Sequence, residues 1–387
     1  MPREFHTDIA ILGGGIGGLW ILNHLREQGY RALLFEKDSL GNGQTIASQG
    51  MIHGGIKYTL GGSTTESSES MADMPELWRQ CLAGGGPLDL RGVQLLSEDY
   101  FLFSDDRLTS RLTAFFGSKS LRGRIEPLKP GQYPRVFSDG FKGALYRMQD
   151  IVVDTSSLIH RLEQKQANYI FQGEAILTLK KDGPVLRLGD GSSVQANYCV
   201  LAAGAGNEDI LKGAGLDQIP MQRRPLHQVM VKASHLPSLY AHAVSMKTGA
   251  KPRLTITTHH RENGEPVWYL GGDLAETGVH RSAEEQIRVA RNELDTLLPW
   301  ISLQGADWAT LRIDRAEPAQ PENNRPGNVF AKAMGPIIVC WPTKLTLAPV
   351  LATQVDSLLP SPRGATTEQL PNLPAPEVAK PPWELLF

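Results

Sequence analysis

Cysteine is scarce in this sequence, with three in 387 residues. Cys81, Cys199 and Cys340 lie far apart and form no Cys-x-x-Cys pair, which argues against a disulfide framework and against a cysteine zinc site. Small buried thiols are the ordinary outcome for such residues. We therefore expect no metal site and a reducing, cytoplasmic compartment.

Long apolar runs and an excess of charge are also missing. No stretch of about 18 apolar residues occurs, so we expect no transmembrane segment. The few residues before the first predicted strand contain no apolar segment typical of a secretion signal. A net charge of −2 gives no electrostatic reason to expect nucleic acid as a partner.

The beginning of the chain predicts a strand, a turn, a helix and a second strand. Residues 8–12 form a short apolar run, residues 19–29 place leucines at helical spacing before a glycine, and residues 31–36 form a second apolar run. Two strands joined through a glycine-rich turn and a helix are typical of a dinucleotide-binding fold.

The turn itself matches G-x-G-x-x-G. Gly13 allows the tight turn, Gly15 lets the backbone approach a diphosphate, and Gly18 lets the helix pack closely on the strand. The N-terminus of the helix then favours the anion. Glu36 ends the second strand roughly 20 residues later, where a carboxylate accepts hydrogen bonds from a ribose. The pattern predicts a dinucleotide without a 2′-phosphate.

The path of the chain after this unit favours FAD over NAD. Instead of further alternating strands and helices, a long insertion leads to a three-strand meander, which returns to the first sheet through residues 193–204. A nucleotide domain split in this way resembles that of two-dinucleotide-fold flavoproteins. We predict an α/β fold (α+β overall), in which an FAD-binding Rossmann-like domain carries an inserted mixed β-sheet substrate domain.

Predicted helices and domain boundaries follow from this path. Further helices are expected over residues 64–83, 151–163, 283–298 and 344–359. The FAD-binding domain is expected to comprise residues 1–83, 145–219 and 327–358, the substrate domain residues 84–144 and 220–326, and a proline-rich, irregular tail residues 359–387.

Three segments resemble the D-amino-acid-oxidase-like superfamily of FAD oxidoreductases. The first is GGGIGG with Glu36. QTIASQGMIHGGIKY, at residues 44–58, is similar to the flavin-facing loop of glycerol-3-phosphate dehydrogenases and L-2-hydroxyglutarate oxidases. PTKLTLAP, at residues 342–349, resembles the closing Lys-Leu-Thr segment of glycerol-3-phosphate dehydrogenases and a lysine-bearing turn of sarcosine oxidases. Family members usually have glycines just before that turn, where this chain has Trp341 and Pro342.

The resemblance implies a set of cofactor contacts along the chain. The glycine turn would hold the diphosphate, the loop after the second strand would lie along the flavin, and the lysine turn would reach the pyrimidine end of the ring. The cofactor-binding positions implied are Gly13, Gly15, Gly18, Glu36, Lys37, Thr45, Ser48, Gln49, Met51, Ile176, Ala203, Gly204, Lys344, Leu345 and Thr346.

Four residues are candidates for the chemistry. His53, in the flavin-facing loop, and His227 could accept the proton of a substrate hydroxyl, although either could be a structural histidine. Arg315 resembles the arginine that binds a substrate carboxylate or phosphate in this superfamily, and the nearby Arg312 competes for that role. Lys344 would stabilise negative charge on the reduced flavin, or it is simply a solvated lysine.

Lys57 and Tyr58 follow His53 and could also reach the pocket. The leading hypothesis is dehydrogenation of a small 2-hydroxy acid or polyol derivative by hydride transfer to flavin N5, with oxygen or a quinone as electron acceptor. Oxidation of an amino acid or secondary amine is the alternative. A flavin monooxygenase and a non-catalytic flavin-binding protein are more remote hypotheses.

Overall fold

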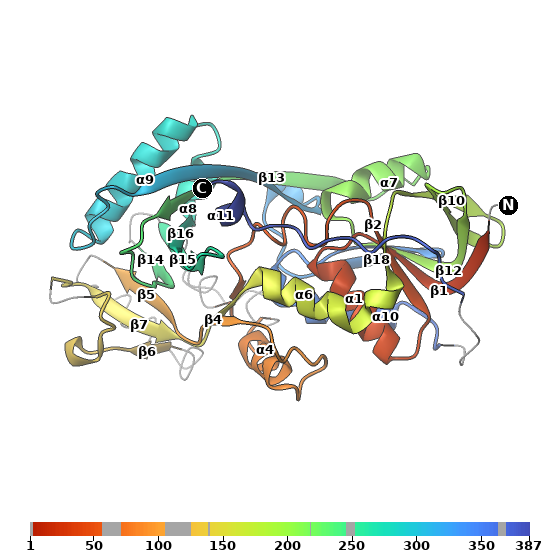
Figure 1. Cartoon of the computed structure of the whole chain (residues 1–387), viewed down its shortest axis with the longest axis horizontal. Helices are drawn as coiled ribbons and strands as arrows, with labels where there is room; N and C mark the ends of the chain where they lie inside the picture. Colours follow the sequence, from red (N-terminus) through yellow and green to blue (C-terminus); the bar gives the residue numbers. More distant parts are fainter. Residues whose placement is uncertain are drawn as a thin grey trace.

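Two eight-stranded sheets and one three-stranded sheet organise the part of the chain that the computed structural model describes (Figure 1). That part comprises residues 3–55, 71–104, 125–137, 140–216, 218–244, 252–362 and 369–387. Within it, no helix has both the length and the apolar character needed to cross a membrane.

The first sheet is built around β1 (Glu4–Leu12). β1 pairs in parallel with β2 (Ala32–Glu36) on one side and with β12 (Ser193–Leu201) on the other. β9 (Ile170–Gln172) continues the sheet beyond β2, and β19 (Ile337–Trp341) continues it beyond β12. The remaining strands are β10 (Ala175–Lys180), β11 (Gly183–Leu188) and β18 (Phe330–Met334). The carboxyl ends of β1, β2 and β12 therefore meet at one edge, where parallel sheets bind ligands.

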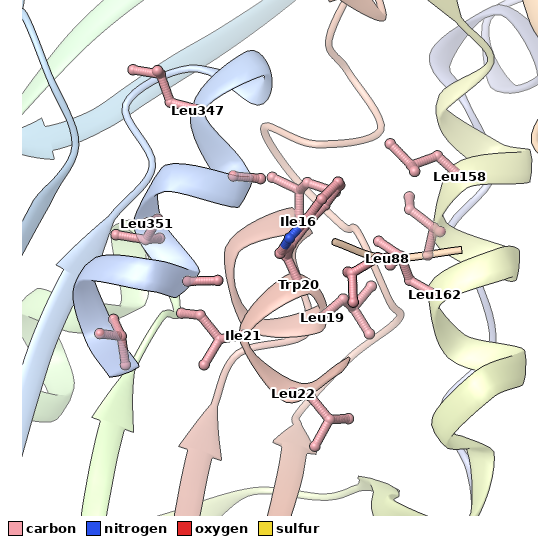
Figure 2. Packing of buried hydrophobic residues seen from close by; sticks show 14 of the residues in the cluster. Ile16, Leu19, Trp20, Ile21, Leu22, Leu88, Leu158, Leu162, Leu347 and Leu351 are labelled. Atoms are coloured by element: carbon pink, nitrogen blue, oxygen red, sulfur yellow. The ribbon is translucent and has the colours of Figure 1, made fainter. Parts of the chain in front are cut away.

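One face of this sheet is covered by α1 (Ile16–Glu27), α6 (Thr155–Gln166) and α10 (Ala348–Ser357). The predicted leucine stripe explains the packing, because the apolar side chains of α1 are buried in a common core with those of both neighbours. Figure 2 shows the labelled side chains of α1 lying between Leu351 of α10 and Leu158 of α6. Each fully buried Leu or Ile in such a core contributes about 1.5–3 kcal/mol.

The second sheet is mixed and is formed by the inserted segments. Its order is β17-β13-β16-β15-β14-β5-β7-β6. The strands are β5 (Tyr100–Ser104), β6 (Ile125–Pro127), β7 (Ala144–Met148), β13 (Met221–Lys232), β14 (Ala241–Ala243), β15 (Leu254–His260), β16 (Pro266–Gly271) and β17 (Asp307–Pro318). The helices that follow its strands are α8 (Asp273–Thr277) and α9 (Ala283–Leu297). A nucleotide-type sheet with an inserted mixed sheet confirms the predicted fold class.

Two local predictions are corrected. The helix expected over residues 151–163 is instead a strand, β8 (Ile151–Val153), followed by α6. The Asp154 carboxylate accepts a 2.6 Å hydrogen bond from Ser157 N, so this N-cap sets the start of the helix. The helix expected over 64–83 is α4 (Met74–Ala83), and residues 64–70 lie outside the described residues.

A small sheet joins the two large ones. β8 pairs with β3 (Met51–Ile52), which belongs to the predicted flavin-facing loop, and with β4 (Leu95–Ser97). The division of the chain into domains stays a proposal. Since β7 pairs with β5 in the second sheet, the boundary that we propose near residue 145 moves to the end of β7.

The proline-rich tail contacts residues near both eight-stranded sheets. Val378 forms an isolated bridge with Leu40, and a short helix, α11 (Pro382–Leu385), ends the chain. In Figure 1 the dark-blue tail runs from the first sheet to α11, beside the labels of β15 and β16. The tail is thus irregular, as predicted, but its last residues are part of the folded structure.

Candidate functional site

The glycine turn lies between β1 and α1 and leaves no room for side chains. A Cβ built on Gly13 would lie 2.5 Å from the Cα of Ala203, and one on Gly18 would lie 1.9 Å from the carbonyl oxygen of Gly13. Gly13 also has a φ of 109°, which side-chain-bearing residues rarely adopt. The turn, the return strand and the start of α1 therefore pack backbone against backbone.

The start of α1 is suited to an anion. Its N-cap is Gly15, which has no side chain to cap the helix, and Ile16 N donates to the Thr45 hydroxyl at 3.1 Å. Glu36 lies next to this turn, because its carboxylate accepts hydrogen bonds from Gly14 N at 2.6 Å and Asp38 N at 2.9 Å. A helix N-terminus beside an acidic residue at the end of β2 fits the diphosphate and ribose of a dinucleotide.

Other predicted cofactor positions lie at different depths around this edge. Ala203 and Gly204 follow β12 and meet the glycine turn, as the close approach to Gly13 shows. Ile176 is 57% exposed on β10, which is separated from β1 by two strands, β11 and β12. The Lys37 side chain is 70% exposed. Contacts of Ile176 and Lys37 with a cofactor stay predictions.

The predicted flavin-facing loop is fixed to the second sheet by three of its residues. The Gln44 side-chain oxygen accepts a hydrogen bond from Ala316 N on β17 at 3.0 Å. The carbonyl of Ala47 accepts from the Tyr269 hydroxyl at 2.9 Å, and Gln49 Nε2 donates to the carbonyl of Tyr269 at 2.7 Å. Ser48 makes a local turn, accepting from Gly50 N at 3.4 Å. The loop therefore links the two sheets.

A cavity of about 220 Å³ lies where this loop, the second sheet and the lysine turn meet. It brings together five of the predicted residues, which come from three separate stretches of the chain. Those five are Gln49, Met51, His53, Arg315 and Lys344. The other lining residues are Arg224, Leu226, Gln228, Pro252, Thr255, Gly271, Gly272, Asp273, Ala275, Glu276, Glu317, Arg325 and Thr343.

Arginines and carboxylates alternate on one wall of the cavity. Arg224 forms a bidentate pair with the buried Glu317, at 2.6 and 2.8 Å. Arg315 Nη1 and Arg325 Nη2 converge on the same oxygen, Glu276 Oε1, at 3.2 and 2.5 Å. Burial, together with the positive charges of Arg325 and Arg224, lowers the pKa of Arg315 to about 10, so it stays protonated at neutral pH.

The alternation of side chains between the two faces of β13 and β17 explains which arginine faces the cavity. In the antiparallel register Arg224 lies opposite Arg315, and His227 lies opposite Arg312. Because side chains alternate between faces, these two pairs point to opposite sides of the sheet. Arg312 donates to the carbonyls of Val279 and Arg281, away from the cavity. Of these two arginines, Arg315 lines the cavity and Arg312 does not.

His227 lies on the face of the sheet that points away from the cavity for the same reason. Its side chain is 1% exposed, and Nδ1 lies 3.0 Å from the carbonyl of Gly278 on the face that carries Arg312. Burial lowers the pKa of His227, which favours the neutral ring of a structural histidine. Among the described residues it does not line this cavity, so a catalytic role for His227 stays a prediction that the cavity does not support.

The lysine turn closes the cavity on the side of the first sheet. Lys344 Nζ donates to the carbonyls of Pro326 and Gly327 at 3.1 and 2.9 Å. Thr346 is buried and donates to the carbonyl of His53 at 3.4 Å. Leu345 begins a one-turn helix, so α10 itself begins at Ala348 rather than at Lys344.

The bulky residue before the lysine turn does not fill the cavity. Trp341 is 1% exposed and its Nε1 donates to the carbonyl of Gly204 at 3.0 Å. Pro342 lies against α1, within 3.4 Å of a Cβ built on Gly17. Trp341 and Pro342 are absent from the cavity lining among the residues described, so this departure from the family pattern leaves the pocket open.

Five charged lining residues were not predicted as site residues from the sequence, namely Arg224, Asp273, Glu276, Glu317 and Arg325. Alternation along β17 and pairing with β13 could have indicated Arg224, but only after the register was known. Arg325 precedes the Pro326 and Gly327 carbonyls that Lys344 binds, a contact with no local sequence signature. Lys57 and Tyr58, two further candidates, lie outside the described residues.

A larger cavity, of about 360 Å³, lies elsewhere, between Asp8, Tyr30 and Pro360. It is at the amino-terminal side of the first sheet's β1–β2 unit, whereas open parallel sheets bind their ligands beyond the carboxyl ends of the strands. The smaller cavity with the converging arginines is therefore the functional candidate.

Comparison with known proteins points in the same direction. A family model described as FAD dependent oxidoreductase (DAO) matches residues 8–326. A probable FAD-dependent oxidoreductase of Pseudomonas aeruginosa is 50% identical over 396 residues, which cover 100% of both chains. The crystal structure of an FAD dependent oxidoreductase from Pseudomonas aeruginosa has a TM-score of 0.87 at 46% identity, covering 100% of this chain and 99% of that one. Glycine oxidase from Geobacillus kaustophilus has the same fold, with a TM-score of 0.67 at 18% identity, over 94% of this chain and 97% of that one.

Proposed function

The chain belongs to the DAO family of FAD-dependent oxidoreductases, and from that premise we propose that it oxidises C2 of a small 2-hydroxy monocarboxylate. Family membership confirms the predicted resemblance, the enzyme class and FAD as the cofactor. The proposal about the substrate rests on one observation, which is that Arg315, Arg325 and His53 line the same cavity.

The residues of the first sheet fit FAD. The side-chain-free turn at Gly13 and Gly18 and the start of α1 would hold the diphosphate, and Glu36 would hold the ribose. The loop that contains Gln49 and the turn that contains Lys344 would border the isoalloxazine ring. FAD, when bound, supplies the acceptor for the two electrons that leave the substrate.

Arg315 and Arg325 would bind the carboxylate of the substrate. Two guanidinium groups already converge on a carboxylate oxygen there, that of Glu276, which is the arrangement a second carboxylate would use. Among the described lining residues, Arg224, Arg315, Arg325 and Lys344 face Asp273, Glu276 and Glu317, an excess of one positive charge. This balance supports a monoanionic acid over a dianionic phosphate ester.

His53 would accept the proton of the substrate hydroxyl. The residue is buried, and Thr346 donates to its carbonyl, so its backbone is fixed where the loop meets the lysine turn. An imidazole can accept a proton at neutral pH, and an alcohol needs such an acceptor while the C2–H bond breaks.

A 2-amino acid is the second candidate. Asp273 and Glu276 place carboxylates in the same cavity, which would stabilise an ammonium group next to the substrate carboxylate. The ammonium has to lose one proton before the C2–H bond breaks, and His53 or one of these carboxylates would accept it.

Anaerobic reduction of the bound FAD tests both candidates. The holoenzyme is mixed with 2-hydroxy and 2-amino monocarboxylates that share the same side chains, and with glycerol 3-phosphate, while flavin absorbance is followed. We expect bleaching by hydroxy acids; bleaching by amino acids alone selects the second candidate. Reduction by the phosphate ester but by no acid contradicts the proposal. Repeating the run in air, and then with a quinone, identifies the electron acceptor.

A further inference from the structure

Trp383 is a deeply buried residue of the C-terminal tail. It belongs to a four-residue helix near the end of the chain, yet it is 1% exposed. Its ring stacks on His259, with centroids 3.9 Å apart and planes at 20°, and meets Tyr269 edge-on with centroids 6.0 Å apart. Met230 and Val267 complete the same core cluster. We call the surface that these residues form around the indole, namely His259, Tyr269, Met230 and Val267, the seat of Trp383.

The seat is flat and uncharged. Burial lowers the pKa of His259 to about 3, so the imidazole beneath Trp383 is neutral under ordinary conditions. Its Nε2 lies 3.0 Å from the hydroxyl of Thr257, which keeps the ring parallel to the indole. A neutral ring held by one hydrogen bond offers Trp383 an apolar stacking surface.

The other side of the seat carries the flavin-facing loop. The hydroxyl of Tyr269 donates to the carbonyl of Ala47 at 2.9 Å and lies 2.6 Å from Gln228 Oε1. Gln49 Nε2 donates both to the Tyr269 carbonyl and to the Thr257 hydroxyl, at 2.7 and 3.2 Å. One residue, Tyr269, therefore separates Trp383 from the loop, and Gln49 lines the candidate substrate cavity.

The upstream part of the tail contacts Leu40, four residues before the flavin-facing loop begins. Leu40 N donates to the carbonyl of Glu377 at 2.8 Å, and Ala379 N donates to the carbonyl of Leu40 at 3.0 Å. The Leu40 side chain also approaches the glycine turn, since a Cβ built on Gly14 would lie 2.5 Å from its Cδ2. The tail thus contacts residue 40 directly and residues 47 and 49 through Tyr269.

The last residues are fastened to the second sheet. Arg261 Nη2 donates to the terminal residue Phe387 at its carbonyl oxygen, at 2.8 Å, and Glu262 N donates to Glu384 Oε1 at 2.6 Å. These bonds lie at the end of β15, so α11 is held on both its polar and its apolar side. The contacts fix Trp383 on its seat.

We propose that residues 376–387 act as a strap that positions the flavin-facing loop, and that Trp383 is its positioning residue. The strap acts through Tyr269 at one end of residues 40–49 and through Leu40 at the other. With the loop held, FAD binds a surface that is already ordered; without the strap, the loop has to be ordered on binding. The inference needs FAD as the cofactor but does not depend on which acid is oxidised.

Replacement of Trp383 in the full-length chain is the test. Apoprotein is titrated with FAD, and the dissociation constant, the visible flavin spectrum and the melting temperature are compared among variants. If Trp383→Ala leaves the loop ordered in about a tenth of the molecules, FAD binding weakens about tenfold. Trp383→Phe keeps an aromatic ring on His259 and should restore most of the affinity and the wild-type spectrum.

A matched control comes from the same helix. Leu385 is 67% exposed, so Leu385→Ala removes an apolar side chain of the tail without touching the seat, and FAD affinity should not change. Wild-type affinity and spectrum in Trp383→Ala would overturn the proposal. Where Trp383→Ala does not accumulate as folded protein, Trp383→Leu keeps apolar volume without stacking, and the same loss of affinity is expected.

A double-mutant cycle distinguishes positioning from general destabilisation. Tyr269→Phe removes the hydroxyl that bonds Ala47 but keeps the ring against Trp383. Since both residues act on the loop along one path, the loss of FAD affinity in the double variant should be smaller than the sum of the two single losses. Additive losses would contradict a path through Tyr269, whatever the melting temperatures show.

Discussion

The glycine turn proposed to hold FAD and the candidate substrate cavity of this enzyme are built in opposite ways. The turn uses the backbone of one contiguous stretch, residues 13–18, together with Glu36, and its function depends on the absence of side chains. The cavity uses charged side chains from β13, β17, α8 and the segment before β18, which meet only in the folded chain. The first is specified by local steric limits, and the second by strand register and long-range ion pairs.

The largest effect is expected at the glycine turn. Gly18→Ala places a methyl group 1.9 Å from the carbonyl oxygen of Gly13, so α1 must move away from β1. If the shift costs the upper end of an overpacking penalty, FAD affinity falls about a hundredfold. Titration of the apoprotein with FAD measures this. Gly189→Ala, where nothing lies within 4 Å of the new Cβ, is the control and should bind FAD normally.

The second largest effect is expected at Arg315, and it distinguishes the function of the cavity from that of the glycine turn. Arg315→Met removes one of the two guanidinium groups that converge on Glu276, so kcat/KM for the acid substrate should fall about a hundredfold while FAD affinity stays unchanged. Arg312→Met is the matched control, since Arg312 lies on the other face of β17. Equal losses in the two variants would contradict the assignment of Arg315.

The sequence predicted correctly which residues come together where they are close along the chain. Gly13, Gly15, Gly18 and Glu36 come together as predicted, because a strand, a turn and a helix in succession leave little freedom. His227 does not line the cavity, because one position along a strand decides which face a side chain occupies, and no local pattern revealed which face of β13 meets the cavity.

The charged residues around Arg315 could not be predicted from the sequence for a related reason. Glu276, in α8, and Arg325 are separated by many residues from each other and from Arg315, and only the fold brings them to one oxygen. Neither has a motif around it, since an ion pair constrains distance in space and not spacing in sequence.

A smaller effect is expected at Glu276. Glu276→Gln removes one negative charge next to Arg315 and Arg325 but keeps the shape of the side chain. Dicarboxylate inhibitors should then gain about tenfold in affinity relative to monocarboxylates, which is about 1.4 kcal/mol. Competitive inhibition constants for acetate and malonate measure the ratio. Glu284→Gln, on the exposed start of α9, should leave it unchanged.

The smallest effect is expected in the pH dependence of stability, and it comes from His259 in the second sheet. Because the folded pKa of His259 is about 3 and the unfolded value 6.5, the unfolded chain binds a proton between these values and the native chain does not. The stability contribution is fully present above pH 6.5 and is lost as pH falls towards 3. Urea unfolding at about pH 8 and about pH 5.5 should show a loss of about 1 kcal/mol from this residue, and His259→Phe should lack it.

The central claim is that the arginine wall binds the carboxylate of the substrate while C2 is oxidised. Its most direct test is the rate of anaerobic FAD reduction by a 2-hydroxy acid and by the matching 2-hydroxy amide, which differs only in lacking the negative charge. The account predicts that the wild-type enzyme prefers the acid about a hundredfold and that Arg315→Met loses most of that preference. Equal rates with acid and amide in the wild-type enzyme would contradict it.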